Sequence, residues 1–287
     1  MANNKKDRRK MQRDRKNKIK KIETYKIIIL SLLIIIAFSI LVILSRSTYG
    51  KLLKKNTFIN DMLSFARMNE KTVFSIDKVT FFSSCDTKNK NIGATNFTIE
   101  NLYSYTDIAL FINSKSEEHN EENTLKSLKI TNVKISKEPK LGEPAMYFKS
   151  INNFAKSDLT EENKIDNELN FEITSSDNVA LDKPMLYNNC ANPITLSYVN
   201  QNIKTDYTML DTTNPIIYNG KLLERCNVKV EDIDASVSFD VEIENNKNQK
   251  FRTTVYFDIP YKADSNSILD GSITVKKDTD FKFYRYE

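Results

Sequence analysis

The feature that most constrains this chain is an uncharged stretch near its N-terminus. Residues 27–45 (IIILSLLIIIAFSILVILS) contain no Asp, Glu, Lys or Arg. As an α-helix this stretch would extend roughly 28 Å, close to the thickness of the hydrocarbon core of a bilayer. A soluble core helix of this length normally has a polar face, and the apolar region of a cleaved signal peptide is shorter. The stretch therefore predicts an uncleaved transmembrane signal-anchor helix lodged in the lipid bilayer.

The charges on the two sides of this stretch are unequal. Residues 1–26 contain twelve Lys or Arg and three acidic residues, a net charge of +9, whereas residues 46–287 have a net charge of −4. Basic segments that flank a membrane helix stay in the cytoplasm. The sequence therefore predicts a single-pass cell-membrane protein with a cytoplasmic N-terminus and an extracytoplasmic C-terminal part.

Residues 1–26 form a basic tail that is rich in Lys, Arg and Asn and poor in apolar side chains. Such a segment cannot bury enough apolar surface to form a core, so we expect it to be disordered. The tail sets the orientation of the membrane helix, and its charge also suits anionic lipid headgroups. We expect no nucleic acid as a partner, because no aromatic or folded module accompanies the charge.

Residues 46–71 are expected to form a juxtamembrane helical stalk. Several apolar positions share one face when they are placed at about 100° per residue. These positions are Leu52, Phe58, Ile59, Met62, Leu63, Phe65 and Ala66. The short helix either continues the membrane helix or packs against the folded part that follows.

From residue 72 onward, apolar and polar residues alternate with a period of two, which is typical of strands with one buried face. The clearest alternation covers residues 236–244 and recurs over 251–259, and six polar residues separate the two runs. We expect them to form an antiparallel hairpin. Further strands are expected at residues 72–82, 106–113, 125–135, 168–174, 194–200, 226–230, 272–276 and 281–286.

The predicted fold class is mainly β: an antiparallel β-sandwich over residues 72–287, preceded by one transmembrane helix and a short juxtamembrane helix. The six prolines fall between the predicted strands or at their ends, where sheets tolerate them. The polar segments 114–123 and 152–167 interrupt the strands. The second segment either divides this part near residue 160 or forms a long loop, and we expect a single domain because one sandwich reaches this size.

Glycine and histidine are too scarce for several classes of enzyme. The two closest of the five glycines are 43 positions apart, which excludes phosphate-binding loops, dinucleotide-binding motifs and nucleophile elbows. His119 is the only histidine, so zinc motifs that need a histidine pair are absent. Residues 264–271 begin like a calcium-binding loop, but Ile268 occupies a ligand position. We therefore expect no cofactor, no metal and a non-enzymatic function.

Cys85, Cys190 and Cys226 all fall in the part that is predicted to be extracytoplasmic, where disulfides persist. One interpretation is a disulfide between Cys190 and Cys226. The other is that all three are reduced and buried, and act as small apolar side chains.

The order of three residues supports an alternative function. His119, Cys190 and Arg225 follow one another along the chain, behind a basic tail and a membrane anchor. In this order and topology the chain resembles bacterial sortases, which are cysteine-dependent surface transpeptidases with an external β-barrel. The resemblance implies that Cys190 is the nucleophile, with His119 and either Arg225 or Arg252 as the other catalytic residues. The chain departs from the family because Tyr-Asn-Asn precedes Cys190 in place of Thr-Leu-x-Thr, and because His119 lies in a glutamate-rich loop.

These features favour a membrane-anchored protein with a non-enzymatic binding or structural role in a bacterial cell envelope. Abundant Asn, Lys and Ile are typical of proteins from AT-rich bacterial genomes. We expect an envelope protein or a glycan as the partner. Tyr284 and Tyr286 alternate along the last predicted strand and would offer such a partner an aromatic surface. A single-pass sensor with a basic cytoplasmic tail is a further alternative.

Overall fold

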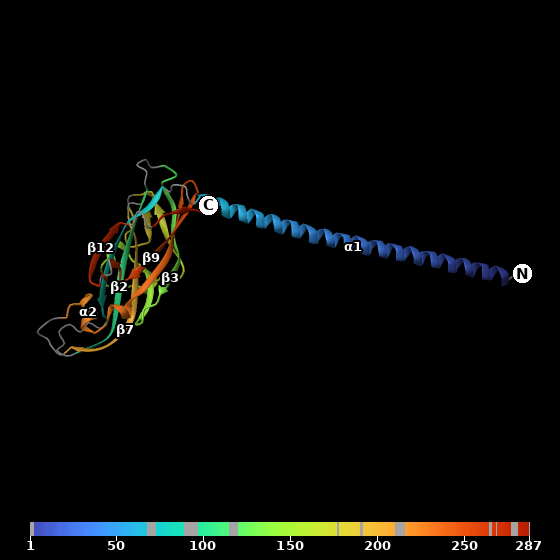
Figure 1. Cartoon of the computed structure of the whole chain (residues 1–287). Helices are drawn as coiled ribbons and strands as arrows, with labels where there is room; N and C mark the ends of the chain where they lie inside the picture. The colour runs from blue at the N-terminus through green and yellow to red at the C-terminus, as the bar shows by residue number, and fades with distance from the viewer. Residues whose placement is uncertain are drawn as a thin grey trace. The chain divides into compact units, whose positions relative to one another are not determined.

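The computed structural model describes residues 3–67, 73–88, 97–114, 120–176, 178–189, 192–209, 216–263, 266–267, 269–276 and 281–286. Contacts divide the chain into two compact units, Met1–Leu63 and Ser64–Glu287. The described part of the first unit is helix α1 (Asn3–Arg67), whose last turn extends past Leu63, and the described strands all belong to the second unit (Figure 1).

Helix α1 runs from Asn3 to Arg67 without a break. The structure therefore differs from the predicted disordered tail, and it joins the predicted stalk to the membrane segment in one helix. The physical reason is local: Lys, Arg, Gln and Met favour the helix, and neither Gly nor Pro occurs before Gly50. Residues 68–71 of the predicted stalk lie outside the described residues.

Within the described residues, one helical segment is long and apolar enough to cross a membrane: Lys18–Ile43 of α1. Its apolar side chains are exposed, and Phe38 keeps 69% of its surface accessible. The hydroxyls of Ser31 and Ser39 donate hydrogen bonds of 2.8 Å to the carbonyl oxygens of Ile28 and Ile35. These bonds satisfy both hydroxyls within the helix itself.

The second unit is mainly β, as the alternation predicts. Its strands are β1 (Phe74–Asp86), β2 (Phe97–Ser114), β3 (Leu125–Lys137), β4 (Glu143–Phe148), β5 (Leu169–Thr174), β6 (Met185–Tyr187), β7 (Ile194–Met209), β8 (Ala235–Asn245), β9 (Lys250–Ile259), β10 (Lys262–Ala263), β11 (Asn266–Ser267), β12 (Gly271–Lys276) and β13 (Tyr284–Arg285). Its short helices are η1 (Ile151–Asn153), η2 (Glu161–Asn163), α2 (Lys221–Arg225) and α3 (Val230–Ile233).

These strands form two large sheets and a small ribbon. The first sheet has the order β12-β1-β2-β7-β4, the second has the order β13-β9-β8-β3-β5-β6, and β10 pairs with β11. Neighbouring strands are antiparallel except for β5 and β6, which are parallel. The predicted hairpin of β8 and β9 is confirmed, with Ser238 opposite Tyr256.

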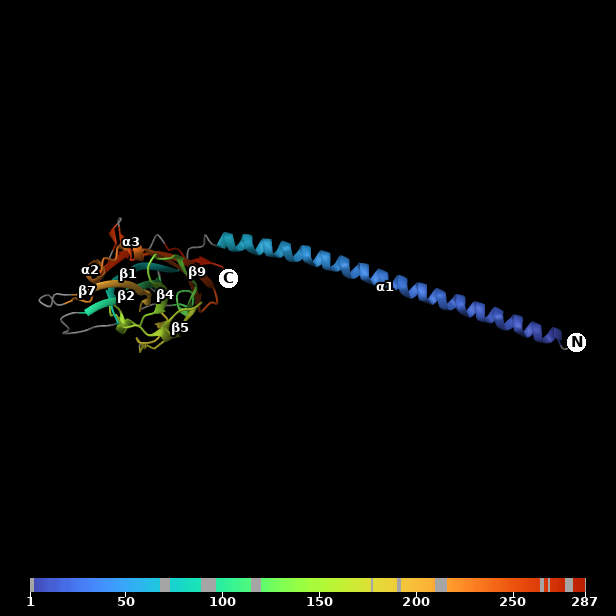
Figure 2. The ribbon, with the colours of Figure 1, turned by 90° about the horizontal axis from the view of Figure 1, so that it is seen from below.

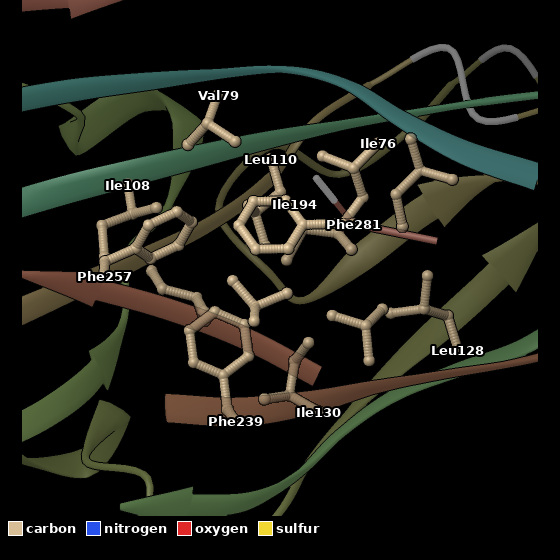
Figure 3. Packing of buried hydrophobic residues seen from close by; sticks show 14 of the residues in the cluster. Ile76, Val79, Ile108, Leu110, Leu128, Ile130, Ile194, Phe239, Phe257 and Phe281 are labelled. Atoms are coloured by element: carbon tan, nitrogen blue, oxygen red, sulfur yellow. The ribbon is translucent and has the colours of Figure 1, made fainter. Parts of the chain in front are cut away.

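The main core lies between the two large sheets, which confirms the sandwich. Val79 and Leu110 extend into it from the first sheet, and Phe239 and Ile130 from the second (Figure 3). The ring of Phe81 meets the ring of Phe257 edge-to-face across this core, with centroids 4.9 Å apart. Burial of alternate side chains from both sheets is what makes the period-two pattern visible in the sequence.

A second apolar cluster lies at one end of the sandwich. It includes residues that were predicted to form a strand. Residues 226–229 form a turn between α2 and α3, and Val230 begins α3, so the predicted strand over 226–230 is wrong. Asn227 has φ 56°, its N–H donates to the Glu224 carbonyl, and the N–H of Val228 donates to the Leu223 carbonyl. This is a Schellman motif, in which the apolar side chains of Val228 and Leu223 belong to one cluster.

Other boundaries also differ from the prediction. Strands β2 and β7 extend beyond the predicted runs, and β13 covers only Tyr284–Arg285. Strand β4 was not predicted because it contains Pro144, which removes a backbone donor. The strand lies at the edge of its sheet, where a proline is tolerated.

Candidate functional site

The outer faces of the two large sheets differ in what covers them. The segment 149–165, which includes η1 and η2, packs on the outer face of the first sheet, where the side chain of Tyr103 hydrogen-bonds the Ser157 carbonyl. The outer face of the second sheet carries polar side chains from β3, β8 and β9. The covered face buries charged side chains, whereas the polar face exposes them to solvent.

Asp107 and Lys149 form a buried charged pair on the covered face. Asp107 is fully buried and Lys149 is 5% exposed, with 3.8 Å between the ammonium nitrogen and a carboxylate oxygen. Asp107 accepts hydrogen bonds from the Ser197 hydroxyl (2.6 Å) and the Ala155 N–H (2.8 Å). Burial raises the pKa of Asp107 to about 6, although the charge of Lys149 and these hydrogen bonds oppose the rise.

Lys149 also holds the covering segment itself. Its ammonium donates to the carbonyl oxygens of Lys156 (2.7 Å) and Asp158 (3.0 Å), and lies 5.4 Å from the centre of the Tyr105 ring. Burial lowers the pKa of Lys149, and the Asp107 charge opposes this. Because Asp107 and Lys149 bind one another and the backbone of segment 149–165, the pair holds this segment against the sheet.

The polar face presents a column of three acidic residues along β8. Asp240, Glu242 and Glu244 point outward, since Val241 and Ile243 between them are buried in the core. We call these three residues the acidic column. Neighbouring strands supply a partner for each: on β3, Lys126 pairs with Glu244, and a bulge turns the Asn132 amide towards Asp240 (2.7 Å).

Glu242 is the centre of the acidic column. Lys129 Nζ lies 3.2 Å from one carboxylate oxygen, and Arg252 Nε lies 3.4 Å from the other. The hydroxyls of Thr131 (3.1 Å) and Tyr286 (3.2 Å) also donate to the carboxylate. Partial burial disfavours the charge of Glu242, but the hydrogen bonds from Lys129 and Thr131 and the nearby cations outweigh it and lower its pKa.

Tyr286 and Arg252 close one side of this arrangement. The guanidinium carbon of Arg252 lies 4.5 Å from the centre of the Tyr286 ring, within the range of a cation–π contact. The Tyr286 N–H donates to the Lys250 carbonyl over 3.0 Å and so fixes the end of the chain against β9. Burial, then the Glu242 charge, raises the pKa of Tyr286, so its hydroxyl stays protonated at neutral pH.

A hollow of about 210 Å³ opens beside Tyr286. It is lined by Ser127, Lys129, Glu242, Ile243, Glu244, Lys250 and Tyr286. Two lysines and two glutamates give this lining no net charge, and the lining also offers hydroxyl groups and an aromatic ring. Such a set of donors and acceptors suits a neutral polar ligand better than an ion. We call it the Tyr286 hollow.

Two of the four residues implied by the sortase resemblance lie in the described part of the chain. His119 and Cys190 lie outside the described residues, so the proposed nucleophile and its partner stay predictions, as does the Cys190–Cys226 disulfide. Arg225 is the last residue of α2 and is exposed. Arg252, the alternative third residue, binds Glu242. Cys226 is a buried free thiol, as is Cys85.

Part of the polar face was predictable from the alternation of apolar and polar residues. The alternation over 236–244 placed Glu242 on a wet face, and that over 281–286 placed Tyr286 on an outward-facing surface. Neither pattern shows which strands lie beside β8, so Lys129 and Arg252 as partners of Glu242 were missed. In the described part of the chain, no three His, Cys, Asp or Glu side chains gather closely enough to hold a metal ion.

Comparison of the chain with models of protein families, with curated proteins and with solved structures found no match in any of the three.

Proposed function

We propose that this chain is a membrane-anchored protein whose β-sandwich lies outside the cytoplasm and binds a neutral, hydroxyl-rich polymer of the bacterial envelope. The role is non-enzymatic. The observation that carries the first half is the exposed apolar span of α1, and the Tyr286 hollow carries the second.

The anchor follows from the energetics of the apolar span. Side chains such as Phe38 and Ile27, 69% and 67% exposed, lose little by leaving water for lipid and gain the full hydrophobic transfer energy. Residues 27–45 contact the bilayer, and the cations of residues 1–26 meet anionic headgroups on the cytoplasmic side. The sandwich is then extracytoplasmic.

Membrane attachment is tested by fractionation of cells that express the full chain. We expect it in the membrane fraction after an alkaline carbonate wash, and a variant that lacks residues 27–45 in the soluble fraction. Protease added to intact cells stripped of any wall then tests the orientation. Digestion of the sandwich in intact cells is expected, whereas protection until lysis would show that the sandwich faces the cytoplasm.

The ligand class follows from the balanced charge of the Tyr286 hollow. A polyanion would meet Glu242 and Glu244, and a polycation would meet Lys129 and Lys250. Hydroxyl groups of a glycan can hydrogen-bond to either sign, and a sugar ring can contact the Tyr286 ring. The hollow thus favours a glycan over a charged ligand.

Glycan binding is tested by sedimentation of the full chain in detergent with purified envelope glycan. Tyr286→Ala is expected to reduce the bound fraction at least tenfold. Tyr256→Ala is the matched control, because Tyr256 is 53% exposed on the same sheet and does not line the hollow. Equal binding by the wild type and both variants would contradict a role for the Tyr286 hollow.

A further inference from the structure

Two cysteines from distant parts of the chain lie in one cluster at the end of the sandwich. Cys85 is the penultimate residue of β1, and Cys226 directly follows α2. Both belong to the apolar cluster that contains Leu222 and Leu223 of α2. Helix α2 packs against β1, and Figure 2 shows the two elements at the same end of the unit. The fold therefore brings together two thiols that are far apart in sequence.

The two sulfur atoms share one buried environment. Cys85 is 1% exposed and Cys226 is 7% exposed. Burial raises the pKa of both thiols, and a charge on Cys226 raises the pKa of Cys85 further. Their membership of one apolar cluster and the packing of α2 against β1 place the two thiols at the same end of the sandwich. In the reduced, folded chain both thiols are therefore poor nucleophiles at neutral pH.

The position of Cys226 is set by the backbone around it. Its N–H donates to the Leu222 carbonyl over 3.0 Å, and the Schellman motif at Asn227 fixes the direction in which the chain leaves α2. Cys85 is held equally firmly, because β1 is paired there with β2 and Cys85 lies opposite Ser104. Two rigid attachments reduce the entropy that is lost when a covalent bond joins them.

We propose that Cys85 and Cys226 form an intramolecular disulfide that ties α2 to the end of β1. This inference rests on the proposed extracytoplasmic location, where disulfides are stable. The two thiols lose two protons and two electrons as the S–S bond forms. The electrons reduce the disulfide of an extracytoplasmic thiol–disulfide oxidoreductase to a dithiol. Oxidation takes place during folding, before both thiols are buried.

The pairing is tested by mass spectrometry of the full chain. The chain is extracted from membranes with an alkylating agent present and no reductant, and then digested. The expected product is a cross-linked peptide pair that contains Cys85 and Cys226, with Cys190 alkylated. Cys190→Ala should leave this pair intact. A Cys190–Cys226 pair, or alkylation of all three cysteines, would overturn the proposal.

A second measurement separates the disulfide from simple packing. Cys85→Ala, Cys226→Ala and the double variant should all lower the Tm of the full chain by roughly 10 °C, since each opens the same loop of roughly 140 residues. With a strong reductant the wild type should fall to the same Tm. Additive losses in the two single variants that persist in reductant would show a packing effect only, and would overturn the disulfide.

Failure of the disulfide and failure of the proposed location are distinguishable. The reduced, unfolded full chain is refolded in detergent with a mixture of reduced and oxidised glutathione, so that compartment plays no part. A Cys85–Cys226 bond after refolding supports the geometry, and its absence from cell membranes in the same study would contradict the outward orientation. No bond in either preparation would overturn the disulfide and leave the orientation to the protease experiment.

Discussion

The ammonium of Lys149 lies 3.8 Å from the carboxylate of Asp107 beneath the segment that covers the first sheet. Removal of one partner from such a pair leaves the other charge buried without compensation. Lys149→Met keeps the length of the side chain but removes its charge and its donors. We expect the free energy of unfolding to fall by roughly 3–5 kcal/mol, as measured by denaturant titration.

Lys156→Met is the matched control for this change. Lys156 belongs to the same segment and is exposed, so its replacement should alter stability by less than about 0.5 kcal/mol. An equal decrease in the free energy of unfolding in the two variants would show that the buried pair does not stabilise the fold.

The pKa of Asp107 predicts a pH dependence. Its folded value of about 6 lies above its value of about 3.9 in an unfolded chain, so folding favours the protonated form. The stability that Asp107 contributes is therefore complete below about pH 4 and is lost as the pH rises through 6. A shift of about two units corresponds to roughly 3 kcal/mol.

This dependence is measured as the difference in unfolding free energy between wild type and Asp107→Asn. The wild type should lose stability relative to the variant between pH 4 and pH 7. Curves that run parallel over this range would contradict the raised pKa.

Glu242 should show the opposite sign. Lys129, Thr131 and Arg252 lower its pKa, so folding favours the ionised form. Its contribution is present above its unfolded pKa of about 4.3 and is lost as the pH falls through the lower folded value. Glu242→Gln should cost roughly 1–2 kcal/mol at pH 7, and the gap to the wild type should close towards pH 3.

Calorimetry at a series of pH values checks this prediction. Glu143→Gln is a suitable control, because Glu143 is exposed on the edge strand of the other sheet. A gap that stays constant on acidification would show that the ion pairs around Glu242 do not stabilise the fold.

Asn227 has φ 56°, in the left-handed region that Ala adopts poorly. Asn227→Ala should therefore lower the free energy of unfolding by roughly 1 kcal/mol, whereas Asn227→Gly should leave it unchanged within about 0.5 kcal/mol. Thermal unfolding of the two variants checks the difference. If Ala and Gly had the same effect, the Schellman motif would not determine the local stability.

The strands were predictable where one face is buried and the other is wet. Val237, Phe239, Val241 and Ile243 alternate with polar residues because β8 lies in the middle of its sheet, with one face on the core. The same two-residue spacing at Cys226 and Val228 misled the prediction. There the two side chains face one cluster because a left-handed residue reverses the chain, and a hydropathy pattern does not record φ.

The candidate site was less accessible to sequence reasoning, because it depends on register between strands. Lys129 lies opposite Glu242 only because bulges in β3 set the pairing. The pairing of Asp107 with Lys149 likewise depends on a polar segment that folds back onto a sheet. From its composition, this segment could be predicted only as a loop. Asymmetry of charge and the apolar span were visible at once, because both are local in the sequence.

The outer edge of β4 has one further consequence. Pro144 removes a backbone donor from this strand, and the N–H of Ile165 already occupies the Met146 carbonyl over 2.8 Å. A strand from a neighbouring molecule finds little to pair with there. If many copies are anchored in one bilayer, they meet one another more often than they would in solution. The occupied edge of β4 then prevents these encounters from leading to polymerisation by strand pairing.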